Sequence, residues 1–237
     1  MKITTTDIKG LILDAFKAVG KGQGLGAREC IALDAYADAD VQAQARAEDV
    51  EEHWWDYPRQ VKDFAFSYAL IYNNIDGVRF HMPALMTADL EGLGHDLDIA
   101  LYMTLCIHPL KGQPRSPHHG HRVYVDYLKS VQVQARIDYY GFDKKQLHAI
   151  AMYLLWQMHH KWHHHFFVPR EERHEAVRKS HESSLKYAGK GDYTLTLDEA
   201  IAIQDEEHRI VRDWFAAGGV DPEAFEFDDE DDEQEQP

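Results

Sequence analysis

The stretch that decides the fold is DKKQLHAIAMYLLWQM, residues 143–158. Its apolar residues recur at intervals of three and four along the chain, at Leu147, Ile150, Ala151, Leu154 and Met158. This repeat places side chains on one face of an α-helix. Asp143 precedes the run, and its carboxylate can accept a hydrogen bond from a free N–H at the helix start. The stretch therefore predicts a strong amphipathic helix, N-capped by Asp143, with one apolar face to bury.

Helical patterns also occupy both ends of the chain. We expect Thr6 to cap a first helix that ends at Gly20 and buries its apolar face. Residues 27–55 are rich in Ala and acids and predict two helices with a break near residues 38–40. Thr196 or Asp198 is expected to begin a last long helix, which runs to about Ala217 and is stopped by two glycines.

One segment predicts a different structure. Residues 73–77, NNIDG, have the composition of a turn, and residues 78–82, VRFHM, alternate between apolar and polar as a short strand does. Pro83 suits the first turn of a helix running through Leu90. The segment therefore predicts a turn, a short extended run and then a helix.

Together these patterns predict a mostly α protein. We expect a multi-helix globular bundle with at most a short strand pair and a disordered acidic C-terminal tail, because 237 residues are enough to bury a substantial core. Three parts are predicted: a helical domain over residues 1–165, a helical extension packed on it over 166–220, and the tail over 221–237.

Acidic residues outnumber basic ones by 41 to 25, a net charge of -16. Ten of the acids lie in residues 221–237, which leaves -6 on residues 1–220. This charge disfavours nucleic acid as a partner and favours a basic protein. Besides the loop at residues 111–121, the candidate partner-binding acids are Asp38, Asp40, Glu48, Asp49, Glu51, Glu52, Asp205, Glu206 and Glu207.

The predicted location is the cytoplasm, with no membrane association. The longest apolar runs are too short to span a bilayer, and the first residues lack the apolar core of a secretion signal. Cys30 and Cys106 are far apart and have apolar neighbours, so we expect reduced, buried thiols with a raised pKa.

Several phrases resemble a family of uncharacterised bacterial proteins, a domain of unknown function. They are residues 15–19 (AFKAV), 28–36 (RECIALDAY), 54–58 (WWDYP), 76–86 (DGVRFHMPALM) and 142–150 (FDKKQLHAI). The resemblance covers about residues 6–162, and this chain departs from the family beyond it. It supports the fold but implies no catalytic residues. By analogy, small acidic proteins of this kind are immunity or antitoxin partners of secreted toxins.

Histidine, with 16 copies, carries the alternative hypothesis of a metal site. If the helix at 143–158 continues, His160 and His164 lie one turn apart, the spacing that zinc requires of two helical ligands. His159 and His163 form a second such pair, and the loop histidines at 118, 119 and 121 can complete a site. The usual zinc motifs are absent, and a polar helix end explains these histidines equally well. Two acid-x-x-His spacings, Glu171 with His174 and Asp205 with His208, match carboxylate-bridged dimetal bundles only weakly.

The remaining motifs point away from catalysis. Residues 22–26, GQGLG, lack the strand and the Gly-Lys-Ser/Thr of a phosphate loop, so we interpret them as a flexible connector. No nucleophile motif is present, and the tryptophans are expected in the core and at its rim. We therefore predict a non-enzymatic acidic binding protein of the immunity or antitoxin type, without cofactor, that neutralises a basic toxin. The alternative is a His-rich metal-binding protein or metal-dependent enzyme that uses zinc.

Overall fold

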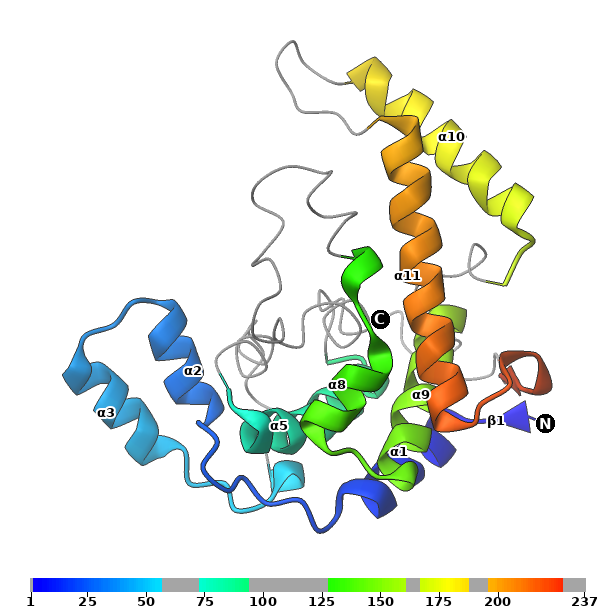
Figure 1. The fold of residues 1–237 in the computed structure, drawn as a ribbon. Coiled ribbons are helices and arrows are strands. Elements are labelled where there is room, and N and C mark those ends of the chain that lie inside the picture. Colours follow the sequence, from blue (N-terminus) through cyan, green and yellow to red (C-terminus); the bar gives the residue numbers. More distant parts are fainter. Residues whose placement is uncertain (1, 57–72, 94–127, 161–166, 188–195, 228–237) are drawn as a thin grey trace, which may run out of the picture.

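The computed structural model describes residues 2–56, 73–93, 128–160, 167–187 and 196–227 (Figure 1). The predicted mostly α fold is confirmed, and these described ranges contain one short strand pair. In chain order the elements are β1 (Lys2–Ile3), α1 (Thr5–Phe16), α2 (Ala27–Asp34), α3 (Ala39–Glu48), the 3-10 turn η1 (Trp54–Asp56), α5 (Ile75–Leu90), α8 (Val133–Tyr140), α9 (Lys144–His160), α10 (Arg170–Tyr187), α11 (Leu197–Gly218), the 3-10 turn η5 (Pro222–Ala224) and β2 (Glu226–Phe227).

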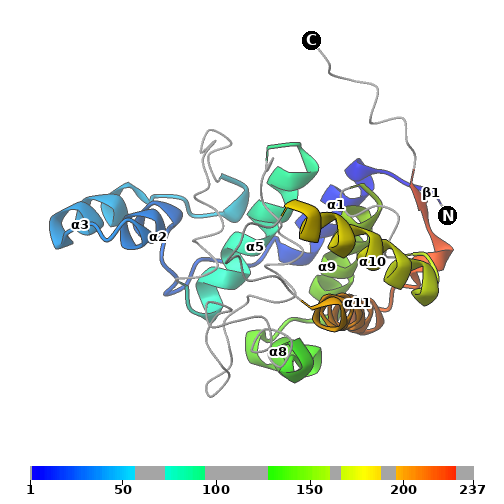
Figure 2. The same cartoon turned by 90° about the horizontal axis from the view of Figure 1, so that it is seen from above.

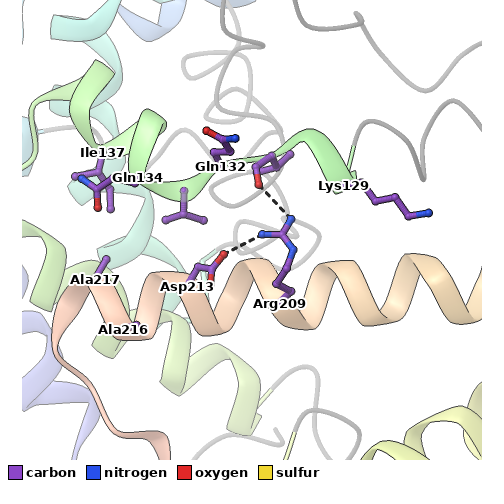
Figure 3. A pocket seen from close by; sticks show the side chains of 10 residues that line it. Lys129, Gln132, Gln134, Ile137, Arg209, Asp213, Ala216 and Ala217 are labelled. Atoms are coloured by element: carbon purple, nitrogen blue, oxygen red, sulfur yellow. Dashed lines mark hydrogen bonds and ion pairs between the residues drawn. The ribbon is translucent and has the colours of Figure 1, made fainter.

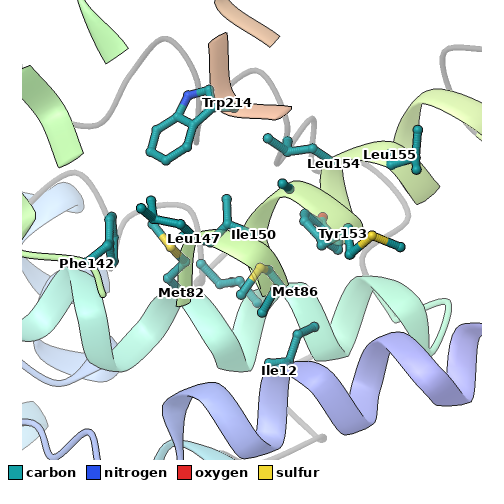
Figure 4. Close-up of a cluster of buried hydrophobic side chains, with 14 of the residues drawn as sticks. Ile12, Met82, Met86, Phe142, Leu147, Ile150, Tyr153, Leu154, Leu155 and Trp214 are labelled. Atoms are coloured by element: carbon teal, nitrogen blue, oxygen red, sulfur yellow. The ribbon is translucent and has the colours of Figure 1, made fainter. Parts of the chain in front are cut away.

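Helix α9 is the centre of the bundle. Asp143 caps it as predicted: Gln146 N donates to Asp143 Oδ1 at 2.9 Å, and Asp143 N donates back to Gln146 Oε1 at 3.2 Å. Beyond the predicted stripe, every residue of α9 from Ala149 to Met158 is buried. The reason is visible in Figure 4, where α9 lies between α11, which carries Trp214, and the two helices α5 and α1 on the other side.

Helix α11 covers one face of α9. Thr196 caps α11 in a reciprocal arrangement with Glu199, and Gly219 ends it in the left-handed conformation, as predicted. A Cβ at Gly218 would overlap the side chain of Ala151, so glycine permits the close approach of the two helices. The side chains that α11 adds to the core are Ile210, Val211, Trp214 and Phe215.

Helix α1 packs on the other side of α9. Its cap is Thr4 instead of the predicted Thr6: Asp7 N donates to Thr4 Oγ1, and Thr4 N donates to Asp7 Oδ2. The helix ends at Phe16 and not at Gly20. The reciprocal bonds between Thr4 and Asp7 explain the earlier start, because Thr6 has no acid three residues on.

The predicted turn and extended run at residues 73–82 are wrong. Asn74 is the N-cap of α5, with Gly77 N donating to its Oδ1 at 3.0 Å, and Pro83 lies inside the helix. Side chains on several faces of α5 are buried, including Val78, Phe80, His81 and Met82. A helix buried on most sides has no polar face, so its sequence lacks the helical repeat that would have identified it.

The strand pair joins the two ends of the described chain. β1 and β2 run parallel, with Lys2 opposite Glu226 and Ile3 opposite Phe227. Figure 1 shows β1 beside the start of α1. Residues 221–227, predicted as the start of a disordered tail, thus contain η5 and β2, because Phe227 contacts the ring of His159 and supplies an apolar anchor. Residues 228–237 lie outside the described residues.

The connector at residues 20–26, predicted to be flexible, is held against the start of α5. Asn73 accepts from Leu25 N at 2.6 Å and donates to Leu25 O at 3.1 Å, and Asn74 donates to Gln23 O at 3.0 Å. A Cβ at Gly24 would overlap the backbone of Gly77. The glycines here serve close backbone contact instead of mobility.

Candidate protein-binding surface

We use the name acidic arm for residues 27–56, which contain α2, α3 and η1. In both views α2 and α3 form a pair at one end of the molecule, away from α10 and α11 (Figures 1 and 2). The arm holds nine acidic and two basic residues, a net charge of -7. The rest of residues 1–220 holds 22 acidic and 23 basic residues. The whole net negative charge of residues 1–220 therefore belongs to the acidic arm.

Four of the six predicted contact acids in the arm are exposed to solvent: Asp38, Asp40, Glu48 and Glu52. Asp38 caps α3 by accepting from Val41 N at 3.0 Å, and Glu48 accepts from Gln44 at 2.9 Å. Asp40 and Glu52 form no hydrogen bond or ion pair with any residue that the structure describes. These two carboxylates are thus fully available to a partner.

Asp49 and Glu51 have structural roles instead. The side chain of Asp49 is only 2% exposed, and its two oxygens accept from Arg28 N and Glu29 N, each at 3.0 Å. It therefore caps α2 from a distant position in the sequence. Glu51, 9% exposed, pairs with Arg28 at 2.7 Å, and this hydrogen bond raises the pKa of the Arg28 guanidinium. Both carboxylates therefore stabilise the arm internally, by joining the segment after α3 to the start of α2.

Of the predicted acids of α11, Asp205 bonds to α10, and all three lie on a helix at the other end of the molecule from the arm (Figures 1 and 2). Asp205 accepts from Arg170 at 2.6 Å and from His174 at 2.9 Å, and Glu206 pairs with Arg209 at 2.7 Å. Partial burial raises the pKa of Asp205, but the bonds from Arg170 and His174 outweigh it and the net shift is downward. Glu207 is half-buried. This cluster joins two helices and is separate from the acidic arm.

Apolar side chains accompany the exposed acids of the arm, and the charge pattern alone did not identify them. They are Tyr36 (92% exposed), Val50 (74%), Val41 (48%) and Trp55 (40%). Helix α3 buries none of its own side chains, although it packs on α2. The sequence indicates these exposed side chains only indirectly: they are large apolar residues among acids, at positions that do not fit the apolar repeat of a helix. Apolar groups surrounded by carboxylates give a surface that can both attract and bury a basic partner.

The histidines predicted as zinc ligands have other contacts where the structure describes them. His160 Nδ1 bonds Trp156 O at 2.9 Å, and its ring stacks on Trp156. His159 stacks on Phe167 and contacts Phe227. His163, His164 and the loop at 111–121 lie outside the described residues. Within those residues, no group of three or more His, Cys, Asp and Glu side chains is placed to hold a metal ion.

Cys30 and His81 lie buried under the connector. Burial, with nearby Asp49 and Glu29, raises the pKa of Cys30 to about 12, so the thiol is protonated and a poor nucleophile at neutral pH. This agrees with the prediction from its neighbours; Cys106 lies outside the described residues. His81 Nε2 donates to Leu25 O at 2.8 Å, and burial lowers its pKa to about 4. Both groups are neutral parts of the core.

A groove of about 610 Å³ separates the start of α8 from α11 (Figure 3). Arg209 crosses it and donates to the backbone oxygens of Leu128 and Val131, at 3.0 and 3.1 Å, and to Asp213 at 2.9 Å. Because these acceptors occupy the guanidinium, the polar side chains that the groove leaves to a ligand are Lys129 and the uncharged Gln132 and Gln134. The acidic arm is therefore the better candidate site.

No curated protein and no solved structure matches the chain significantly. No helix in the described ranges is long and apolar enough to cross a membrane. Residues 4–168 match the family described as "Family of unknown function (DUF6714)", which confirms the resemblance predicted over about residues 6–162. Since this match covers more than half of the 237 residues, the chain belongs to DUF6714, a family of unknown function.

Proposed function

We propose that this protein is a non-enzymatic acidic binding protein of the immunity or antitoxin type, which neutralises a basic toxin by covering its active surface with the acidic arm. The observation that carries the proposal is the location of charge. The arm has a net charge of -7, whereas the rest of residues 1–220 is close to neutral. Within residues 1–220 this distribution orients a cationic partner toward the arm, and the ten acids of residues 221–237 form a second, separate acidic segment.

The surface of the arm suits tight binding as well as fast encounter. Exposed carboxylates such as Asp40 and Glu52 steer a basic protein, but surface ion pairs alone contribute only about 0–1 kcal/mol each. Burial of apolar area supplies the larger share of the binding free energy. Tyr36 and Val50 provide that area within the same unit.

The carboxylates also account for neutralisation. A toxin that acts on a polyanion must present Lys and Arg side chains around its active surface. Acidic side chains on a rigid helical pair can occupy those positions and exclude the substrate. The bonds of Asp49 to α2 and of Glu51 to Arg28 keep the pair rigid.

Co-expression with the protein of the neighbouring reading frame tests this function, because toxin and immunity genes occur as pairs. We expect the two proteins to co-purify in one complex and the acidic protein to restore growth to cells that express its neighbour. A chain with Asp40→Lys and Glu52→Lys should bind at least about tenfold more weakly and restore less growth. Failure of the unaltered chain both to bind and to rescue would overturn the proposal.

A further inference from the structure

Tyr36, at the turn between α2 and α3, has an unusual backbone. Its φ is +52°, and it alone among the non-glycine residues that the structure describes has a positive φ. The turn forms a complete Schellman motif: Tyr36 N donates to Leu33 O at 3.1 Å, and Ala37 N donates to Ala32 O at 2.9 Å. Glycine is the usual residue at this position, because a Cβ there is strained. Tyrosine is thus unfavourable for the turn itself.

The side chain of Tyr36 adds nothing to the fold in return. It is 92% exposed, more than any other large hydrophobic side chain in the described part of the chain. It makes no hydrogen bond and no ring contact with any residue that the structure describes. Tyrosine thus replaces the glycine that the turn favours, and no contact within the fold compensates for it. Such a position points to a role in contact with another molecule.

The surroundings of Tyr36 indicate the chemistry of what it contacts. The tyrosine lies two residues before the exposed Asp38 and four before the exposed Asp40, on the arm that holds the net negative charge of residues 1–220. A tyrosine ring attracts a guanidinium or ammonium group to its face. An apolar pocket rimmed by Arg or Lys therefore complements this turn in both shape and charge.

We propose that Tyr36 is the aromatic anchor of the interface, inserted into a pocket of the basic partner whose rim carries Arg or Lys. This inference rests on the proposed function and names the residue that contributes most to the binding free energy. Tyrosine is among the residues that most often dominate binding energy, since it is rigid and buries a large area. The left-handed turn holds the ring clear of the arm's surface, and the flanking carboxylates meet the rim.

The test compares Tyr36→Gly, Tyr36→Phe and a control, Tyr139→Ala, which removes a ring that is 47% exposed on α8. Tyr36→Gly relieves the strained φ, so its midpoint of thermal unfolding should rise by about 2–4 °C. The dissociation constant for the purified protein of the neighbouring reading frame, measured by calorimetry, should rise at least about 30-fold. Tyr36→Phe and Tyr139→Ala should each stay within about threefold of the unaltered chain.

The outcomes separate the two proposals. If Tyr36→Gly binds as tightly as the unaltered chain while Asp40→Lys with Glu52→Lys weakens binding at least about tenfold, the anchor is refuted and the proposed function stands. A lower unfolding midpoint for Tyr36→Gly would refute the strain at the turn, and the loss on Tyr36→Ala against Tyr36→Phe then decides the anchor. If the unaltered chain does not bind, both proposals fail.

Discussion

Asp49 lies nine residues after Asp40, and the two carboxylates have different surroundings. Asp49 is buried and accepts from two backbone N–H groups at the start of α2, whereas Asp40 is exposed in the first turn of α3. A buried carboxylate that caps a helix stabilises the fold, while an exposed one is free for a partner. The acids of the arm thus divide into a structural group and a binding group.

Replacement of Asp49 by alanine tests the structural group. Asp49→Ala leaves two backbone donors of α2 without their acceptor and removes one partner of Arg28. We expect the free energy of unfolding, measured in denaturant, to fall by about 2–3 kcal/mol. Asp40→Ala, the matched control, should change it by less than about 0.5 kcal/mol. Equal effects of the two changes would contradict the division.

His81 predicts a specific pH dependence of stability. Its pKa is about 4 in the folded protein against 6.5 in the unfolded chain, so below pH 6.5 the unfolded state takes up the proton first and stability falls. Between pH 7.5 and 5.5 we expect a loss of about 1 kcal/mol from this group. The His81→Gln protein lacks this titrating group and provides the baseline. Its free energy of unfolding should fall by about 1 kcal/mol less than that of the unaltered chain over the same pH range. Identical pH dependence in both proteins would refute the buried neutral imidazole.

At the scale of elements, the glycine-rich connector is a fixed part of the fold. Its backbone bonds Asn73 and Asn74 and approaches Gly77 closely. These contacts join segments about fifty positions apart and fix the start of the acidic arm against α5. The arm is therefore attached to the bundle by hydrogen bonds and not by a loose tether.

Alanine in place of two different glycines tests this attachment. Gly24→Ala places a Cβ on the backbone of Gly77 and should lower the free energy of unfolding by at least about 2 kcal/mol. Gly10, inside α1, has open space around it, so Gly10→Ala should stabilise by about 0.5–1 kcal/mol. A neutral Gly24→Ala would indicate the flexible connector that the sequence predicts.

The sequence predicts some elements of this structure correctly and others not. The helices with an apolar and a polar side, α1 and α11, were predictable because their periodicity is local, although the cap of α1 is Thr4 and not the predicted Thr6. Helix α5 was not, because burial on several sides removes the polar face from its sequence. For the site, charge adds up along the chain, so the acidic region was predictable. The exposure of each acid was not, because the burial of Asp49 depends on Arg28, twenty-one positions away.

For the whole molecule, the region beyond the family match is part of the core. The match ends at residue 168, yet α11 packs on α9 and β2 pairs with β1. Trp214 and Phe215 of α11 are almost fully buried. Helix α11 therefore completes the fold of this family member by covering the apolar face of α9.

Truncation and a single substitution test this dependence. A chain ending at residue 168 exposes the apolar face of α9 and should lose its cooperative thermal unfolding transition. In the full chain, Trp214→Ala should lower the free energy of unfolding by about 3–5 kcal/mol. The control, Trp55→Ala, removes a ring that is 40% exposed and should cost less than about 1 kcal/mol. A cooperative transition in the truncated chain would show that the extension is dispensable.

The central claim is that the acidic arm, and not net charge as such, binds a basic protein. The most direct measurement is calorimetry of the neighbouring frame's protein against two matched charge reversals. One is Asp40→Lys with Glu52→Lys on the arm, and the other is Glu171→Lys with Glu172→Lys, two exposed acids in the first turn of α10. Both alter the net charge equally. We predict that the arm variant raises the dissociation constant at least about tenfold, and that this increase is smaller at high salt. The dissociation constant of the α10 variant should stay within about threefold of that of the unaltered chain. Equal weakening by both variants, or none by either, would contradict the claim.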